Sequence, residues 1–112
     1  MAAGMDDPVI AQVAAYNAHD VDGFVACYAT DAEIVDGGSG RTLMSGHADM
    51  RERYARLFAT HPDAHADIRE RMREGDWVVD HELVHTGGEQ RGYVVAYRLR
   101  DGLISRVLIL GG

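Results

Sequence analysis

Apolar positions recur at helical spacing in the first half of the chain, which predicts three helices there. Asp7-Pro8 supplies the N-cap and the first-turn proline of the first helix, and Asp20 caps a second, shorter one. A third helix ends at His61-Pro62, because the residue before a proline disfavours helical backbone angles. The predicted buried positions are Val9, Val13 and Tyr16, then Val21, Phe24, Val25 and Tyr28, then Met50, Tyr54, Leu57 and Phe58.

Alternation of apolar and polar residues predicts strands in the rest of the chain. The predicted strands cover residues Ala32–Asp36, Ala64–Arg73, Trp77–Thr86, Arg91–Arg100 and Leu103–Leu110. In the second of these, Ala64, Ala66, Ile68 and Met72 are expected on the buried face. Helices followed by consecutive antiparallel strands predict an α+β fold with the helices packed on one face of the sheet.

The last two predicted strands are apolar on both faces. Tyr93 and Val95 alternate with Val94 and Ala96, and residues 103–110 show the same double pattern. Strands buried on both faces need a cover on each face, and the helices supply only one. We therefore expect a homodimer that forms through the outer face of the sheet.

The bulk properties narrow the class of protein. At 112 residues the chain has the size of one domain, covering residues 1–112. Its net charge of −7 opposes binding to nucleic acid or to an anionic membrane. No apolar run is long enough to span a bilayer, the N-terminal residues show no secretory signal, and the single cysteine cannot form an intramolecular disulfide. We expect a cytoplasmic protein, and its use of arginine without lysine suggests a bacterial source.

The stretch from Tyr16 to Tyr54, YNAHDVDGFVACYATDAEIVDGGSGRTLMSGHADMRERY, combines helix, short helix, strand and helix, with Asp36 where the strand ends. This order resembles the nuclear transport factor 2-like superfamily, which includes ketosteroid isomerases, limonene epoxide hydrolases and polyketide cyclases. The resemblance implies a cone-shaped α+β fold around one apolar pocket that takes a small hydrophobic molecule. It also implies a dimer.

The resemblance suggests roles for three residues. Asp36 falls at the position of the isomerase general base, and Tyr28 and Tyr54 fall at positions that line the pocket. A carboxylate in an apolar pocket has a raised pKa, which suits proton transfer near neutral pH. The alternatives remain open: Asp36 before a glycine loop is also typical of a turn cap, and tyrosines on helix stripes are typical of packing.

Two positions depart from the isomerase pattern. Gln12 stands where the isomerases have the tyrosine that binds the oxyanion, and Tyr16 lies one helical turn later. Val95 stands where isomerases and polyketide cyclases have a late-strand acid. Loss of one oxyanion donor costs about 10²–10³ in rate, so steroid isomerisation itself is not expected.

A second group of polar residues lies at Asp80-His81-Glu82. Strand alternation puts Asp80 and Glu82 on the pocket side, across from Arg91, Tyr93 and Val95 of the next strand. Such a network could bind a polar group or activate water, and with Asp36 it could imitate the Asp-Arg-Asp arrangement of epoxide hydrolases. A structural ion-pair network or an exposed strand edge is the alternative, and a slip of one residue would exchange His81 for Glu82.

No phosphate-binding, metal or cofactor motif is present in the sequence, and we expect neither metal nor cofactor. The leading hypothesis is a small-molecule pocket protein, with isomerase, cyclase or hydratase chemistry if it is an enzyme. Asp36 would move the proton, and Tyr16, Tyr28 or Tyr54 would polarise an oxygen. Candidate ligand contacts are Tyr28, Gln12, Asp80, Glu82, Arg91, Tyr93 and Val95. The alternatives are a non-catalytic ligand-binding or protein-interaction dimer, or a filled core without a pocket.

Overall fold

The computed structural model describes residues 7–112. The N-terminal segment of residues 1–6, where no secretory signal was predicted, lies outside the described residues. The elements, in chain order, are α1 (Pro8–Asn17), α2 (Val21–Val25), β1 (Tyr28–Asp36), β2 (Thr42–Ser45), α3 (Gly46–Thr60), β3 (His65–Glu74), β4 (Trp77–Thr86), β5 (Glu89–Arg100) and β6 (Leu103–Gly111). Within this described part, no helix is long and apolar enough to cross a membrane.

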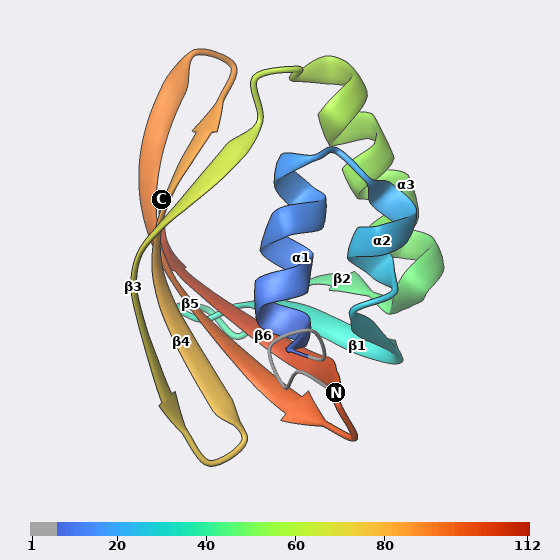
Figure 1. The fold of residues 1–112 in the computed structure, drawn as a ribbon, viewed down its shortest axis with the longest axis vertical. Coiled ribbons are helices and arrows are strands. Elements are labelled where there is room, and N and C mark those ends of the chain that lie inside the picture. Colours follow the sequence, from blue (N-terminus) through green and yellow to red (C-terminus); the bar gives the residue numbers. More distant parts are fainter. Residues whose placement is uncertain (1–6) are drawn as a thin grey trace.

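Six strands form one sheet in the order β2-β1-β6-β5-β4-β3. Of the five strand pairs formed by residues 7–112, the β1–β6 pair is parallel and the other four are antiparallel. The three helices lie on one side of this sheet, which bends around them (Figure 1). The α+β prediction is confirmed, although α3 follows the first two strands and does not precede the sheet.

The first part of the chain contains one correction. Tyr28 was predicted on the second helix, but α2 ends at Val25 and Tyr28 begins β1, paired with Ile104 of β6. The predicted caps are present: the side chain of Asp7 accepts hydrogen bonds from the amides of Val9 and Ile10. The four-residue strand β2 was not predicted, because it carries little alternation of its own.

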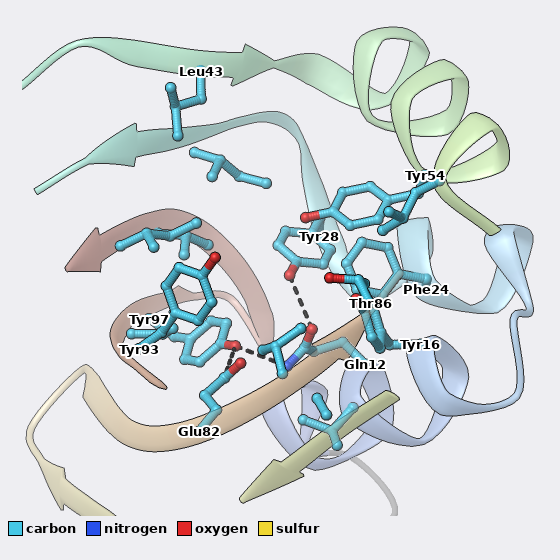
Figure 2. Close-up of a pocket in the computed structure, with 18 residues that line it drawn as sticks. Gln12, Tyr16, Phe24, Tyr28, Leu43, Tyr54, Glu82, Thr86, Tyr93 and Tyr97 are labelled. Atoms are coloured by element: carbon cyan, nitrogen blue, oxygen red, sulfur yellow. Dashed lines mark hydrogen bonds between the residues drawn. The ribbon is translucent and has the colours of Figure 1, made fainter. Parts of the chain in front are cut away.

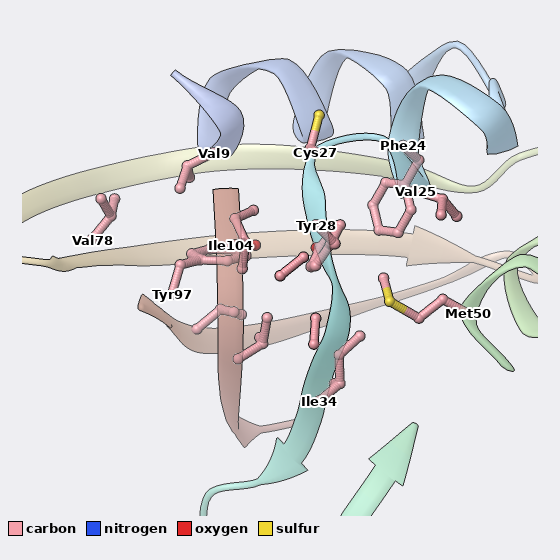
Figure 3. Close-up of a cluster of buried hydrophobic side chains, with 14 residues drawn as sticks. Val9, Phe24, Val25, Cys27, Tyr28, Ile34, Met50, Val78, Tyr97 and Ile104 are labelled. Carbon is pink, nitrogen blue, oxygen red and sulfur yellow. The ribbon is translucent and has the colours of Figure 1, made fainter. Parts of the chain in front are cut away.

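The hydrophobic core fills the space between the helices and the inner face of the sheet (Figure 3). Phe24 from α2, Ile34 from β1, Met50 from α3 and Ile104 from β6 are its largest fully buried apolar side chains. Because these side chains come from elements far apart in sequence, their burial holds the helical layer against the sheet.

A β-bulge in β3 changes which side chains face inward. Ile68 pairs with Glu82 and Glu70 pairs with His81, so Arg69 is an extra residue on β3. Beyond the bulge the alternation reverses: Met72, predicted to be buried, is 68% exposed. The guanidinium of Arg71 instead turns toward Asp80, which is fully buried, and donates two hydrogen bonds of 2.6 and 2.8 Å to its carboxylate.

Replacing Arg71 tests this buried ion pair. Arg71→Leu leaves the Asp80 carboxylate buried without its partner, so we expect the free energy of unfolding to fall by roughly 3 kcal/mol. The matched control is Arg56→Leu, because Arg56 pairs with Glu52 on the exposed surface of α3. Exposed pairs contribute about 0–1 kcal/mol. Equal losses in the two variants, measured by urea denaturation, would contradict a special role for the Arg71–Asp80 pair.

Candidate functional site

A cavity of about 370 Å³ lies between the helices and the inner face of the sheet. All three helices and all six strands contribute to its lining, which is mostly apolar. Five tyrosines also line it: Tyr16, Tyr28, Tyr54, Tyr93 and Tyr97. Its volume falls within the range of small-molecule sites, about 300–1,000 Å³, so the core is not completely filled.

Glu82 is the one charged residue in the lining drawn from residues 7–112. It lies on the inner face of β4, opposite Tyr93 of β5, and is only 7% exposed. Burial raises the pKa of its carboxyl group to about 7, and the nearby negative charge of Asp80 acts in the same direction. The hydrogen bond from Tyr97 and the positive charge of Arg71 act against this rise. Glu82 can therefore both accept and donate a proton near neutral pH.

No cation neutralises Glu82 among the described residues. Arg71 directs its guanidinium to Asp80, and neither residue belongs to the cavity lining. Arg91, the predicted partner, lies on the surface and donates hydrogen bonds to Glu89 and to the backbone carbonyl of Gly112. The predicted network of Asp80, Glu82 and Arg91 is therefore not formed.

A chain of four buried side chains ends at Glu82 (Figure 2). The Tyr28 hydroxyl donates to Oε1 of Gln12 at 3.1 Å, and Nε2 of Gln12 donates to the Tyr97 hydroxyl at 3.1 Å. The Tyr97 hydroxyl in turn donates to Oε2 of Glu82 at 3.0 Å. Burial raises the pKa values of Tyr28 and Tyr97 well above their ordinary range, so both remain protonated donors.

Three further tyrosine hydroxyl groups remain available to a ligand. Tyr16, Tyr54 and Tyr93 line the cavity, and their hydroxyls form no hydrogen bond with any residue from 7 to 112. Figure 2 shows the hydroxyls of Tyr54 and Tyr93 directed into the space between the helices and the sheet. Burial raises the pKa of Tyr16 to about 12 and also raises that of Tyr54, so both are neutral donors.

Aromatic packing holds Tyr16 and Tyr54 in place. The ring centroid of Tyr16 lies 5.3 Å from that of Phe58, and the ring centroid of Tyr54 lies 4.4 Å from that of Phe24. Edge and tilted contacts of this kind add to the energy of burial and restrict ring rotation. The hydroxyls of Tyr16 and Tyr54 are therefore presented by a rigid wall of the cavity.

Asp36 does not belong to the cavity lining. Its carboxylate accepts hydrogen bonds from the Ser39 hydroxyl at 2.8 Å and from the Gly38 amide at 3.2 Å, in the turn after β1. The hydrogen bonds from Ser39 and Gly38 lower its pKa, whereas a residue in an apolar pocket would have a raised pKa. The geometry matches the turn cap, which was the alternative interpretation.

The structure thus brings together most, but not all, of the candidate residues. Those that line the cavity are Gln12, Tyr16, Tyr28, Tyr54, Glu82, Tyr93 and Val95, and those that do not are Asp36, Asp80 and Arg91. Two contributors were missed. Tyr97 shares its strand face with Tyr93 and Val95, which is a usable signal, whereas the inward turn of Arg71 depends on the bulge in β3.

Comparison with known proteins assigns the chain to a family. Residues 9–107 match the model of the SnoaL-like domain, so the chain belongs to that family, within the nuclear transport factor 2-like superfamily. No curated protein sequence matches the chain.

Three solved structures illustrate the fold similarity. An uncharacterised cystatin-fold protein from Novosphingobium aromaticivorans is 29% identical, with a TM-score of 0.86 over 93% of this chain and 95% of that one. A protein with a ketosteroid isomerase-like fold from Catenulispora acidiphila, solved with trimethylamine, is 24% identical, with a TM-score of 0.78 over 92% of this chain and 83% of that one. A candidate polyketide cyclase from Sinorhizobium meliloti is 21% identical, with a TM-score of 0.79 over 92% and 93%. The last two similarities concern the fold alone.

The raised pKa of Glu82 predicts a dependence of stability on pH. The folded state holds this proton up to about pH 7, but the unfolded chain releases it near its ordinary value of 4.5. Stability contributed by the neutral carboxyl group is therefore fully present below pH 4.5 and is lost as the pH rises through 7.

Relative to Glu82→Gln, the free energy of unfolding of the wild type should fall by on the order of 3 kcal/mol between pH 4.5 and pH 7. Denaturation at a series of pH values measures this difference, with Glu52→Gln on the surface as control. A constant difference between wild type and Glu82→Gln would contradict the prediction.

Proposed function

We propose that the protein is a cofactor-independent enzyme that transfers a proton on a small, mostly apolar substrate, with Glu82 as the general acid and base. One observation carries this proposal: among residues 7–112, the cavity lining contains a single carboxyl group, that of Glu82, whose pKa of about 7 suits proton transfer in both directions. A purely structural carboxylate would be expected to pair with a cation, as Asp80 does with Arg71.

The arrangement supports enolisation of a carbonyl compound. Ionised Glu82 removes a proton from the carbon next to the carbonyl group, and the electron pair of that C–H bond moves toward the carbonyl oxygen. The hydroxyl of Tyr16, Tyr54 or Tyr93 donates a hydrogen bond to the oxygen as its negative charge develops. Protonated Glu82 then returns the proton to a different carbon of a conjugated enolate, which gives isomerisation. Alternatively, the enolate carbon forms a bond to a second carbonyl carbon, whose oxygen takes the electron pair of the C=O π bond and then the proton from Glu82, which gives cyclisation.

This assignment moves the base within the family pattern. The resemblance suggested Asp36, at the end of β1, whereas Glu82 lies on β4 and approaches the cavity from a different strand. The neutral tyrosines would replace the oxyanion donors that Gln12 and Val95 do not supply. Membership of the SnoaL-like family, and the fold similarity to a candidate polyketide cyclase, are consistent with such chemistry.

A ligand and turnover screen tests the proposal on three matched proteins: wild type, Glu82→Gln and Asp36→Asn. Small ketones, terpenoids and polyketide fragments are screened first by thermal shift and then for exchange of the acidic C–H proton with deuterium from solvent. We expect Glu82→Gln to lose at least about 10²-fold in exchange rate. Asp36→Asn, which removes a charge outside the cavity, should keep the rate. For the wild type, kcat/KM should increase with pH up to about 7 and then level off, because the base must be ionised.

The opposite pattern, loss in Asp36→Asn with retention in Glu82→Gln, would contradict this assignment and restore Asp36 as the base. Binding without exchange in any protein would favour the non-catalytic ligand-binding alternative.

We also propose that the protein forms a homodimer through the outer face of the sheet. Val94 and Leu110 are paired across β5 and β6 on the face away from the helices, and they are 41% and 42% exposed. Adjacent exposed apolar side chains on a sheet face are typical of a covered surface. Sedimentation velocity should show a dimer for the wild type and a monomer for Val94→Asp, whereas Ile10→Asp, at an equally exposed site on α1, should remain dimeric. A monomeric wild type would contradict the proposal.

A further inference from the structure

We propose that Gln12 is a positioning residue that fixes Oε1 of Glu82 as the oxygen that exchanges the proton with the substrate. This inference rests on the proposed function of Glu82, but it concerns the direction of the hydrogen bonds that reach it. The direction of each bond follows from the donor and acceptor capacity of the groups involved.

The backbone carbonyl of Val9 determines how the Gln12 amide is oriented. Nε2 of Gln12 lies 3.2 Å from this carbonyl oxygen and 3.1 Å from the Tyr97 hydroxyl. A backbone carbonyl can only accept hydrogen bonds, so the nitrogen, and not the oxygen, of the amide must face Val9. With the amide in this orientation, Oε1 faces Tyr28, whose hydroxyl must donate to it.

The same amide orientation determines the direction of the Tyr97 hydroxyl. An amide NH₂ group cannot accept, so the Tyr97 oxygen accepts from Gln12, and its own proton is left for its other partner, Oε2 of Glu82. If Oε2 carried a proton and donated it to Tyr97, the Tyr97 proton would have no acceptor among residues 7–112. Tyr97 is 4% exposed, and a buried donor without an acceptor is costly.

The two oxygens of Glu82 therefore differ. Oε2 remains an acceptor in both protonation states, and it holds the carboxyl group in place. Oε1 forms no hydrogen bond with residues 7–112, so the proton of neutral Glu82 resides on Oε1. The carboxyl oxygen that exchanges its proton is thus the one left free for a ligand in the cavity.

The hydrogen-bonded series of Tyr28, Gln12 and Tyr97 should also limit how far the pKa of Glu82 rises. The hydrogen bond from Tyr97 to Glu82 is stronger when the carboxyl group is ionised. Removal of this donor by Tyr97→Phe should raise the pKa of Glu82 by about one pH unit or more. Gln12→Leu frees the Tyr97 hydroxyl to rotate and to accept a hydrogen bond from neutral Glu82, which should raise the pKa of Glu82 as well. Tyr93→Phe is the matched control, since Tyr93 lies opposite Glu82 but forms no hydrogen bond with it.

The experiment is a ¹³C NMR titration of the Glu82 carboxyl carbon in these four proteins, combined with infrared spectra at pH 5. We expect raised pKa values in Tyr97→Phe and Gln12→Leu, and no change in Tyr93→Phe. The C=O stretch of neutral Glu82 should move to higher frequency in Tyr97→Phe, because its carbonyl oxygen, Oε2, loses a donor.

An unchanged or lowered pKa in either Tyr97→Phe or Gln12→Leu, or an unchanged stretch in Tyr97→Phe, would overturn the inference. Either result could leave the raised pKa of wild-type Glu82, and with it the proposed function, intact. A wild-type Glu82 that titrates near 4.5 would instead contradict the proposed function itself.

Discussion

The buried ion pair between Arg71 and Asp80 determines the character of the whole site. The bulge at Arg69 turns Arg71 inward, and the guanidinium then binds Asp80 through two short hydrogen bonds. Because this cation is taken by Asp80, Glu82 two residues later faces the cavity with only a neutral hydroxyl donor. The bulge in the edge strand thus supplies a paired cation to Asp80 but none to Glu82. A buried carboxyl group without a paired counter-charge has a raised pKa.

The rest of the cavity is suited to a carboxyl group of this kind. Rigid aromatic contacts hold neutral tyrosine hydroxyls at the wall, while Gln12 orients a chain of donors toward one oxygen of Glu82. No arginine or histidine lines the cavity among the described residues, so the lining favours uncharged ligands over anions. The chain belongs to the SnoaL-like family, and its one charged cavity residue among residues 7–112 lies on β4, not at the end of β1 where the resemblance suggested a carboxylate.

Much of the fold and most of the residues that line the cavity follow from the sequence. Strand alternation placed Glu82 opposite Tyr93 and on the cavity side, because the period of two is a local property of the backbone. Arg71 and Met72 were assigned to the wrong faces of β3, because a bulge reverses the alternation of side chains and no residue type in this stretch indicates a bulge. Asp36 was correctly placed at a strand end, but the direction of its side chain depends on hydrogen bonds to Ser39 and Gly38, which spacing does not reveal.

The most direct test of the account is the pKa of Glu82 in the wild-type protein without ligand, measured by ¹³C NMR of its carboxyl carbon with Glu82→Gln used to assign the signal. The account predicts a midpoint near pH 7, because burial without a cation disfavours the carboxylate. A midpoint near 4.5, the ordinary value of a glutamate, would mean that water or an unrecognised partner solvates the carboxylate, and the assignment of Glu82 as the acid and base would be wrong.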